Sequence, residues 1–324
     1  MNFLRRFLER SDTKKLELKP TTPIAQPEPS TAPAAESPYA PAPPSTAELH
    51  YGDGVTRPLN EEVLISFLTP RHITFGQITD TGSVRGNNQD AAVSFFASSR
   101  SSEERPDFGL FIVADGMGGH HDGEKASAIA ARTVADAVLT SIYIPMLKDV
   151  YDNQTPITET LVEAIEAANV QVHSSIPDGG TTLTCVILIN DLAYLAHVGD
   201  SRLYLISKGS TEQLTRDHSL VQRLIELDQL TPDEAVEHPQ KHVLYRALGQ
   251  NDNVEVDALT RRLPPRSRLL LCSDGLWGLV EQSDLMDIVN QAAQPLDACQ
   301  KLVALANKRG GLDNITVIVI FLPD

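Results

Sequence analysis

The chain is poor in cysteine, in aromatic residues and in long apolar runs. Its three cysteines, Cys185, Cys272 and Cys299, lie far apart in 324 residues and form no disulfide framework, which indicates a reducing compartment. No apolar run is long enough to cross a bilayer, and the N-terminus lacks the continuous apolar core of a signal peptide. We therefore expect a cytoplasmic protein with no transmembrane segment.

Positive charge is also scarce. The chain has 27 Lys and Arg residues against 43 Asp and Glu residues, which gives a formal net charge of -16. The field of such a protein repels polyanions, so we expect no binding to nucleic acid. The sequence also has no G-x-x-x-x-G-K-[ST] loop, which argues against ATP or GTP hydrolysis by that route. The acidic residues could instead hold cations.

The first part of the chain differs in composition from the rest. Residues 20–58 are dominated by Pro, Ala, Thr, Ser and Glu, which cannot bury enough apolar surface to offset the entropy of ordering. Before them, a short apolar face mixed with arginines is formed by Phe3, Leu4, Phe7 and Leu8. A frayed terminus is the favoured interpretation of this face, and a docking helix for a partner or a membrane surface is the alternative. We predict a basic segment and disordered tail at 1–70 and one domain at 71–322.

From residue 71 onward, β-branched apolar runs alternate with stretches of helical periodicity. The expected strands are Ile73–Ile78, Gly109–Ala114, Thr182–Ile189, Ala193–Val198, Arg202–Ile206, Leu269–Cys272 and Ile315–Leu322. The expected helices are Glu124–Leu139, Thr158–Ser174, Leu220–Leu227 and Ser283–Lys308, the last interrupted by Pro295. The short turn between the strands at 193–198 and 202–206 favours antiparallel pairing. The pattern predicts an α+β layered domain.

Four expected strands carry an aspartate at one end. Asp115, Asp200 and Asp274 each follow an expected strand, and Asp313 precedes one. Since antiparallel neighbours end and begin at the same edge, the four carboxylates could gather on one rim. Any one Asp-Gly or Asp-Asn pair is more often a turn than a ligand, but four together favour a cation site. Oxygen donors of this kind suit Mg²⁺ or Mn²⁺.

A glycine-rich segment at residues 79–90 adds an arginine to these carboxylates. Arg85 stands five residues before Asp90 and follows the expected strand Ile73–Ile78. A planar guanidinium can grip two phosphate oxygens at once. A loop arginine alone is usually only solvated, but its place beside Asp90 favours a phosphate-binding role.

These segments together resemble the metal-dependent protein phosphatase family of the 2C type, in its bacterial form. The matching segments are Arg85, Asn88-Gln89-Asp90, Val113-Ala114-Asp115-Gly116-Met117-Gly118-Gly119-His120, Gly180-Thr181-Thr182, Gly199-Asp200-Ser201-Arg202, Ser273-Asp274-Gly275 and Asp313-Asn314-Ile315-Thr316. The resemblance implies a sandwich of two antiparallel β-sheets flanked by helix pairs. It also implies a protein-serine/threonine phosphatase that acts in signalling, with two Mn²⁺ or Mg²⁺ ions, or three, at one end of the sandwich.

The same resemblance assigns roles to individual residues. Asp115 resembles the carboxylate that bridges two metals, and Gly116 the backbone carbonyl ligand. Asp274 and Asp313 resemble the remaining direct ligands of one metal. Asp90 resembles the acidic residue that binds a metal or orients its water, and Asp200 resembles a ligand of a third metal. Arg85 resembles the phosphate-binding arginine. Two divalent ions about 3.5–4 Å apart would lower the pKa of a shared water, which then attacks phosphorus in line.

The sequence departs from the family pattern at two positions. Gln89 stands where the family often has Glu, and the lost charge is expected to weaken metal affinity. Met117 stands where eukaryotic relatives have a histidine that acts as the general acid, so protonation of the leaving group is left to solvent. No cysteine has an arginine six positions later, which excludes a cysteine-nucleophile phosphatase.

Residues 214–249 resemble the flap of bacterial members, and a lid beside the site would choose among substrates. His238 and His242 have a spacing found in zinc sites, but Pro239 lies between them and a structural or lid role is favoured. The expected partners are proteins phosphorylated on serine or threonine and a cognate kinase, and we expect a monomer. A non-catalytic relative and a two-metal nuclease are the alternatives, and the intact aspartates and the acidic charge argue against them.

Overall fold

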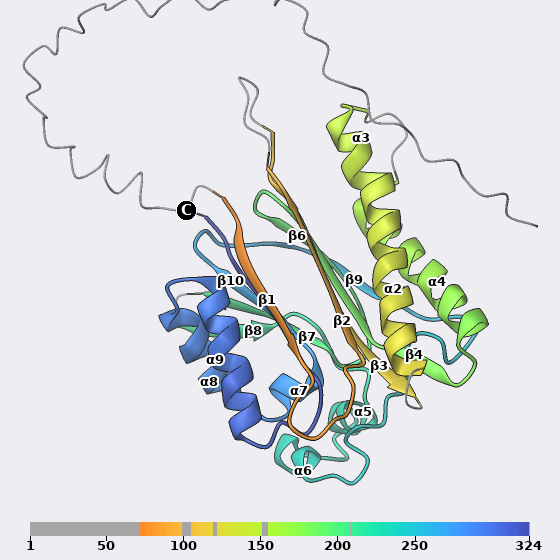
Figure 1. Ribbon diagram of the computed structural model, residues 1–324, viewed down its shortest axis with the longest axis vertical. Helices are drawn as coiled ribbons and strands as arrows, with labels where there is room; N and C mark the ends of the chain where they lie inside the picture. Colours follow the sequence, from red (N-terminus) through yellow and green to blue (C-terminus); the bar gives the residue numbers. More distant parts are fainter. Residues whose placement is uncertain (1–71, 99–104, 119–121, 151–154, 208, 324) are drawn as a thin grey trace, which may run out of the picture. The chain divides into compact units, whose positions relative to one another are not determined.

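The computed structural model describes residues 72–98, 105–118, 122–150, 155–207 and 209–323 (Figure 1). The tail predicted at 1–70 and the apolar face within it lie outside the described residues.

Two antiparallel sheets form the centre of the fold (Figure 1). The first sheet has the order β1 (Thr74–Asp80), β11 (Ile315–Phe321), β10 (Arg268–Cys272), β7 (Arg202–Ser207) and β8 (Ser210–Gln213). The second has the order β2 (Asp90–Ala97), β3 (Phe108–Gly118), β5 (Leu183–Ile189), β6 (Leu192–Val198) and β9 (Asp257–Arg262), with β4 (Gly179–Thr181) beside β3.

Each sheet is covered on its outer face by a pair of helices (Figure 1). The second sheet carries α2 (Asp122–Val138) and α4 (Ile157–Ser175), and the first carries α8 (Gln282–Gln291) and α9 (Pro295–Lys308). The short helical elements are η1 (Leu139–Tyr143), α3 (Ile144–Leu147), α5 (Leu220–Glu226), α6 (Pro232–Val236) and α7 (Asp274–Trp277). The layers therefore run helix, sheet, sheet, helix, which confirms the predicted fold class.

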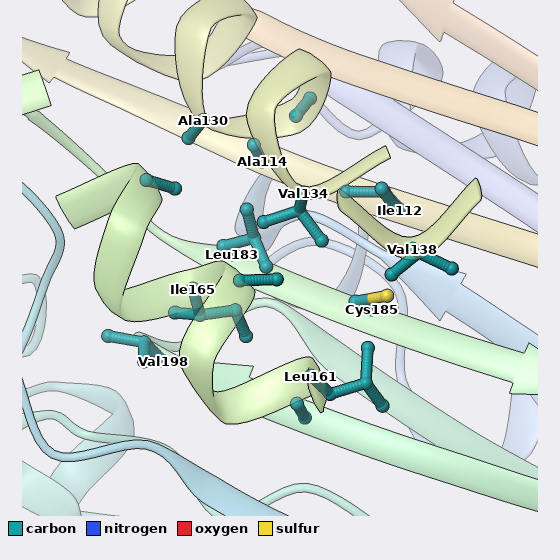
Figure 2. Close-up of a cluster of buried hydrophobic side chains, with 14 of the residues drawn as sticks. Ile112, Ala114, Ala130, Val134, Val138, Leu161, Ile165, Leu183, Cys185 and Val198 are labelled. Atoms are coloured by element: carbon teal, nitrogen blue, oxygen red, sulfur yellow. The ribbon is translucent and has the colours of Figure 1, made fainter. Parts of the chain in front are cut away.

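Strand β3 shows why the central strands read as continuous apolar runs. Phe111 and Val113 lie in the core between the two sheets, while Ile112 and Ala114 lie in the core under α2 and α4. Successive side chains of a strand point to opposite faces, so a strand covered on both faces needs apolar residues at every position. Figure 2 shows the outer of these two cores, where Ile112 lies near Val134 and Val138 of α2.

Small side chains let α2 approach the sheet closely. Its buried face is formed largely by alanine and valine, namely Ala126, Ala130, Ala131, Val134 and Val138. In the described part of the chain, Asp122–Leu147 is the one helical stretch that is long and apolar enough to span a bilayer by length and composition. The α2 part of that stretch places its apolar face in the core, which accounts for its composition.

The longer helices were predicted close to their observed bounds, but the break at Pro295, several short elements and the strands β2 and β9 were missed. Pro295 begins α9 instead of interrupting one long helix, because proline is well tolerated at the first helical position. Strand β9 is almost entirely exposed and has the sequence DALTRR, so it shows no apolar alternation. Strand β2 is half-buried along its whole length and gave no clear pattern either.

The pairing predicted for the strands at 193–198 and 202–206 is wrong. β6 pairs with β5 and β9 in the second sheet, whereas β7 pairs with β10 and β8 in the first. The connection Gly199-Asp200-Ser201 therefore crosses between the sheets. Gly199 has φ of +111°, and a Cβ at this position would lie 2.5 Å from the Cβ of Thr182. Glycine thus allows the tight crossing that a hairpin interpretation overlooked.

Candidate active site

Both sheets bring carboxylates to the same end of the sandwich. Asp90 begins β2 and lies opposite Asp115 in the register of β2 with β3. In the other sheet, β10 and β11 are neighbours, so Asp274 after β10 lies near Asp313 before β11. In Figure 1 this end is marked by α7 and the adjacent ends of β1 and β2.

Asp200 comes to the site from the crossing between the sheets. This residue is almost fully buried, with 5% of its surface exposed. Trp277 Nε1 donates to the backbone oxygen of Asp200 at 3.0 Å, and His218 Nδ1 accepts from the backbone N–H of Gly199 at 3.0 Å. The turn that carries this carboxylate is therefore held by α7 on one side and by the segment after β8 on the other.

The carboxylates are close enough to disturb one another. Burial raises the pKa of Asp115 well above its usual range, and the negative charges of Asp90 and Asp274 raise it further. The pKa of Asp200 is likewise raised well above its usual range, mainly by burial and secondly by the negative charge of Asp274. The pKa of Asp90 rises to about 7, mainly through burial. Such a group of like charges requires a counter-charge to be ionised at neutral pH.

One oxygen of Asp90 has no partner. Its Oδ2 accepts a hydrogen bond from Ser273 Oγ at 2.8 Å, while its Oδ1 is buried and has no hydrogen-bond partner among the described residues. A buried carboxylate oxygen without a donor is costly, and a cation would satisfy it. Because the donors gathered here are carboxylate oxygens, the residues present fit Mn²⁺ or Mg²⁺.

Arg85 lies at the edge of the same cluster. Its Nη2 donates to Asp313 Oδ2 at 2.7 Å, and 49% of the Arg85 side chain is exposed. The loop is held to the chain before β11, because Ser83 N donates to Gly311 O at 2.8 Å and Asn314 Nδ2 to Asn87 O at 2.9 Å. The arginine is thus anchored beside the carboxylates, with half of its side chain exposed.

The cluster is not a ready-made ligand set. In the ranges that the structure describes, no three His, Cys, Asp or Glu side chains stand together in a geometry that would hold an ion. Asp313 turns toward Arg85, and Asp90 gives one oxygen to Ser273, because like charges repel and each carboxylate takes the nearest donor. The structure therefore brings the predicted residues to one place, and their role as ligands stays a prediction.

Gly116 is fixed by its surroundings. Its N–H donates to Gln89 O at 3.1 Å, and a Cβ at this position would lie 2.1 Å from Gly123 O. Only glycine fits this close approach of β3 to α2. The contact fixes the backbone of Gly116 against α2, and the role of its carbonyl as a ligand stays a prediction.

The segment predicted as a flap borders the site. It contains α5 and α6, and a bridge between Ser219 and Leu244 joins its two ends. His242 Nδ1 lies 3.9 Å from Asp274 Oδ2, while His238 Nδ1 accepts from the backbone N–H of Gln240. These two histidines have different partners, and the described residues supply no third ligand for a zinc ion.

Two supporting residues were missed by the sequence analysis as parts of the site. Asn314 is buried, accepts from Gln89 N through Oδ1 at 2.8 Å and donates to Thr81 O through Nδ2 at 2.9 Å. Ser273 is also buried and bonds to Asp90. Each of them is adjacent in sequence to a predicted ligand, Asn314 to Asp313 and Ser273 to Asp274, and this adjacency could have indicated their supporting role.

Comparison with known proteins identifies this arrangement. A family model described as protein phosphatase 2C matches residues 86–308. The chain belongs to the protein phosphatase 2C family. Protein phosphatase PhpP of Streptococcus pneumoniae is 37% identical to it over 248 residues, which cover 75% of this chain and 95% of PhpP. The protein is accordingly a protein-serine/threonine phosphatase.

Solved structures of protein phosphatase 2C relatives share the fold. The serine/threonine phosphatase of S. agalactiae has a TM-score of 0.68 and 32% identity, and the match covers 78% of this chain and all of that one. The catalytic domain of the serine/threonine phosphatase PstP, solved in complex with two manganese ions, has a TM-score of 0.63 and 30% identity, over 78% of this chain and 99% of that domain.

Proposed function

We propose that this protein phosphatase 2C member hydrolyses phosphoserine and phosphothreonine in proteins with a water activated by two divalent cations. The observation that carries the proposal is the convergence of carboxylates from both sheets around the unpartnered Oδ1 of Asp90. The manganese ions of the PstP structure support Mn²⁺ as the cation, and Mg²⁺ suits the same oxygen donors.

The residues that would hold the cations come from five elements or turns. They are Asp90, Asp115, Gly116, Asp274 and Asp313, with Asp200 for a third ion. When bound, a pair of such ions supplies a water of lowered pKa and neutralises phosphate oxygens. The protein's part is to gather the carboxylates at one end of the two sheets, where burial and mutual repulsion raise the pKa of Asp115 and so favour a bound cation.

Arg85 would bind and orient the phosphate. Its guanidinium is half-exposed and lies beside Asp313, so it can exchange this carboxylate for two phosphate oxygens. Met117 has no proton to give, and the leaving serine or threonine oxygen would be protonated by solvent. Charge neutralisation and orientation are then the main contributions of the protein to the rate.

The biological setting is also proposed. The acidic charge and the cysteine content support a cytoplasmic monomer that opposes a serine/threonine kinase in signalling. Residues 1–70 would be a tail outside a catalytic domain at 71–322.

The test is hydrolysis of a phosphothreonine peptide by the full-length protein with Mn²⁺, with a chelator, and with the variant Asp274→Asn. We expect release of phosphate with Mn²⁺ and loss of activity in the other two cases. Ser267→Ala is the control, because this buried serine lies before β10, at the end opposite Asp274. Activity that survives chelation would exclude the metal mechanism.

A further inference from the structure

A buried serine links the two sheets beside the carboxylate cluster. Ser273 lies between β10 and α7 in the first sheet, and its Oγ donates to Oδ2 of Asp90, which begins β2 in the second. The same Oγ accepts from the backbone N–H of Thr316 at 2.9 Å. Ser273 and Thr316 are both fully buried, so water does not compete for these bonds.

The direction of the Ser273 bond follows from its single proton. Oγ accepts from Thr316 N through a lone pair, and its one hydrogen can be donated to a different group. Two acceptors lie near it, Asp90 Oδ2 at 2.8 Å and Asn314 O at 3.4 Å. The shorter bond to a carboxylate is the stronger one. Oδ2 of Asp90 is therefore committed to Ser273.

A second chain of polar groups ends at Thr316. Asn88 Nδ2 donates to Thr79 Oγ1 at 2.8 Å, and Thr79 Oγ1 lies 2.9 Å from Thr316 Oγ1. Hydrogen bonding from Thr316 and Ser273 favours the ionised form of Asp90 and opposes the effect of its burial on the pKa. The Asp90 carboxylate is thus oriented through its Oδ2, while its Oδ1 has no hydrogen-bond partner among the described residues.

We propose that Ser273 is a positioning residue for the phosphatase reaction: by holding Oδ2 of Asp90, it presents Oδ1 to the divalent cation or to the water that the cation holds. Thr316 assists it from β11. This inference rests on the proposed function, because it requires a cation at Asp90. Partners that orient a ligand in this way typically change metal affinity by about 10–100-fold.

The experiment is a titration of the metal-free, full-length protein with Mn²⁺, followed by calorimetry and by electron paramagnetic resonance of free Mn²⁺. The variants are Ser273→Ala and Thr316→Val, which remove the two hydroxyls singly. Ser267→Ala is the matched control, since this serine is also fully buried beside β10 but lies at its opposite end. Hydrolysis of p-nitrophenyl phosphate is measured over a range of Mn²⁺ concentrations.

We expect Ser273→Ala to weaken Mn²⁺ binding at one site by about tenfold or more, with kcat largely restored when Mn²⁺ saturates. Thr316→Val keeps the backbone N–H that Ser273 accepts, so a smaller weakening in the same direction is expected. If Ser273→Ala does not fold, Ser273→Cys, which keeps the shape of the side chain but is only a weak donor, tests the inference. Wild-type Mn²⁺ affinity in a folded Ser273→Ala protein would overturn the inference. Failure of the wild-type protein to bind Mn²⁺ or to hydrolyse the ester would instead overturn the proposed function, and the inference with it.

Discussion

Asp90 shows at the scale of one residue how the fold changes a carboxylate. In the unfolded chain its pKa is ordinary, but in the folded protein burial and the charges of Asp274 and Asp313 raise the pKa to about 7. An acid with a raised folded pKa stabilises the fold fully below its unfolded pKa and loses that contribution as the pH rises through the folded pKa.

We therefore expect the metal-free protein to lose stability between about pH 4 and pH 7. The free energy of unfolding should fall by about 1 kcal/mol or more, since one pKa unit is worth about 1.4 kcal/mol. Denaturant unfolding with a chelator at pH 5 and pH 8 measures this difference. Asp90→Asn should reduce the slope, and saturating Mn²⁺ should oppose the loss because it favours the ionised carboxylates. Equal stability at both pH values would contradict the shift.

Arg85 allows a second prediction at the same scale. Arg85→Ala removes the phosphate contact but leaves the carboxylates, so KM for a phosphothreonine peptide should rise about 10–100-fold, as expected for a charge-assisted pair worth about 1.5–3 kcal/mol. Mn²⁺ affinity should not fall, because the variant removes a positive charge beside Asp313. Arg85→Lys, which keeps the charge and loses the two-pronged geometry, is the matched variant. An unchanged KM in both would exclude Arg85 from phosphate binding.

Among the elements, the connection from β6 to β7 is sensitive to substitution at Gly199. Gly199→Ala would place a residue with a Cβ at φ of +111° and against Thr182, so we expect a loss of about 2 kcal/mol or more in the free energy of unfolding. Gly86→Ala is the control, because no atom lies within 4 Å of a Cβ there, and its effect should be below about 0.5 kcal/mol. Similar unfolding curves for the two variants would argue against a strained crossing.

The helices and inner strands could be predicted because they are covered on defined faces. α4 shows apolar residues at helical spacing, and β11 is apolar at nearly every position because both of its faces are covered. β9 could not be found, since an exposed edge strand needs only backbone pairing. The β6 and β7 pairing was wrong because a three-residue connection can serve either a hairpin or a crossing between sheets, and only packing decides between them.

For the whole molecule, the buried cores found among the described residues are formed between Ile73 and Leu322. A variant that lacks residues 1–70 is therefore expected to fold and to hydrolyse small phosphopeptides at a similar rate. Thermal unfolding and the rate with Mn²⁺ check this against the full chain. A loss of more than about tenfold, near 1.4 kcal/mol of activation free energy, would show that the tail belongs to the working domain.

The sequence by itself determined the residue types of the site and their order, and it placed Asp200, Asp274 and Asp313 at strand ends, because hydrophobic period and turn chemistry are local properties. It also determined the fold class through the quoted motifs. Only the tertiary structure decided that Asp90 lies opposite Asp115, that Ser273 reaches across from the other sheet, and that the turn at Gly199 joins two sheets. Contacts between residues as far apart in sequence as Asp90 and Ser273 depend on how two sheets pack, and no local pattern encodes that packing.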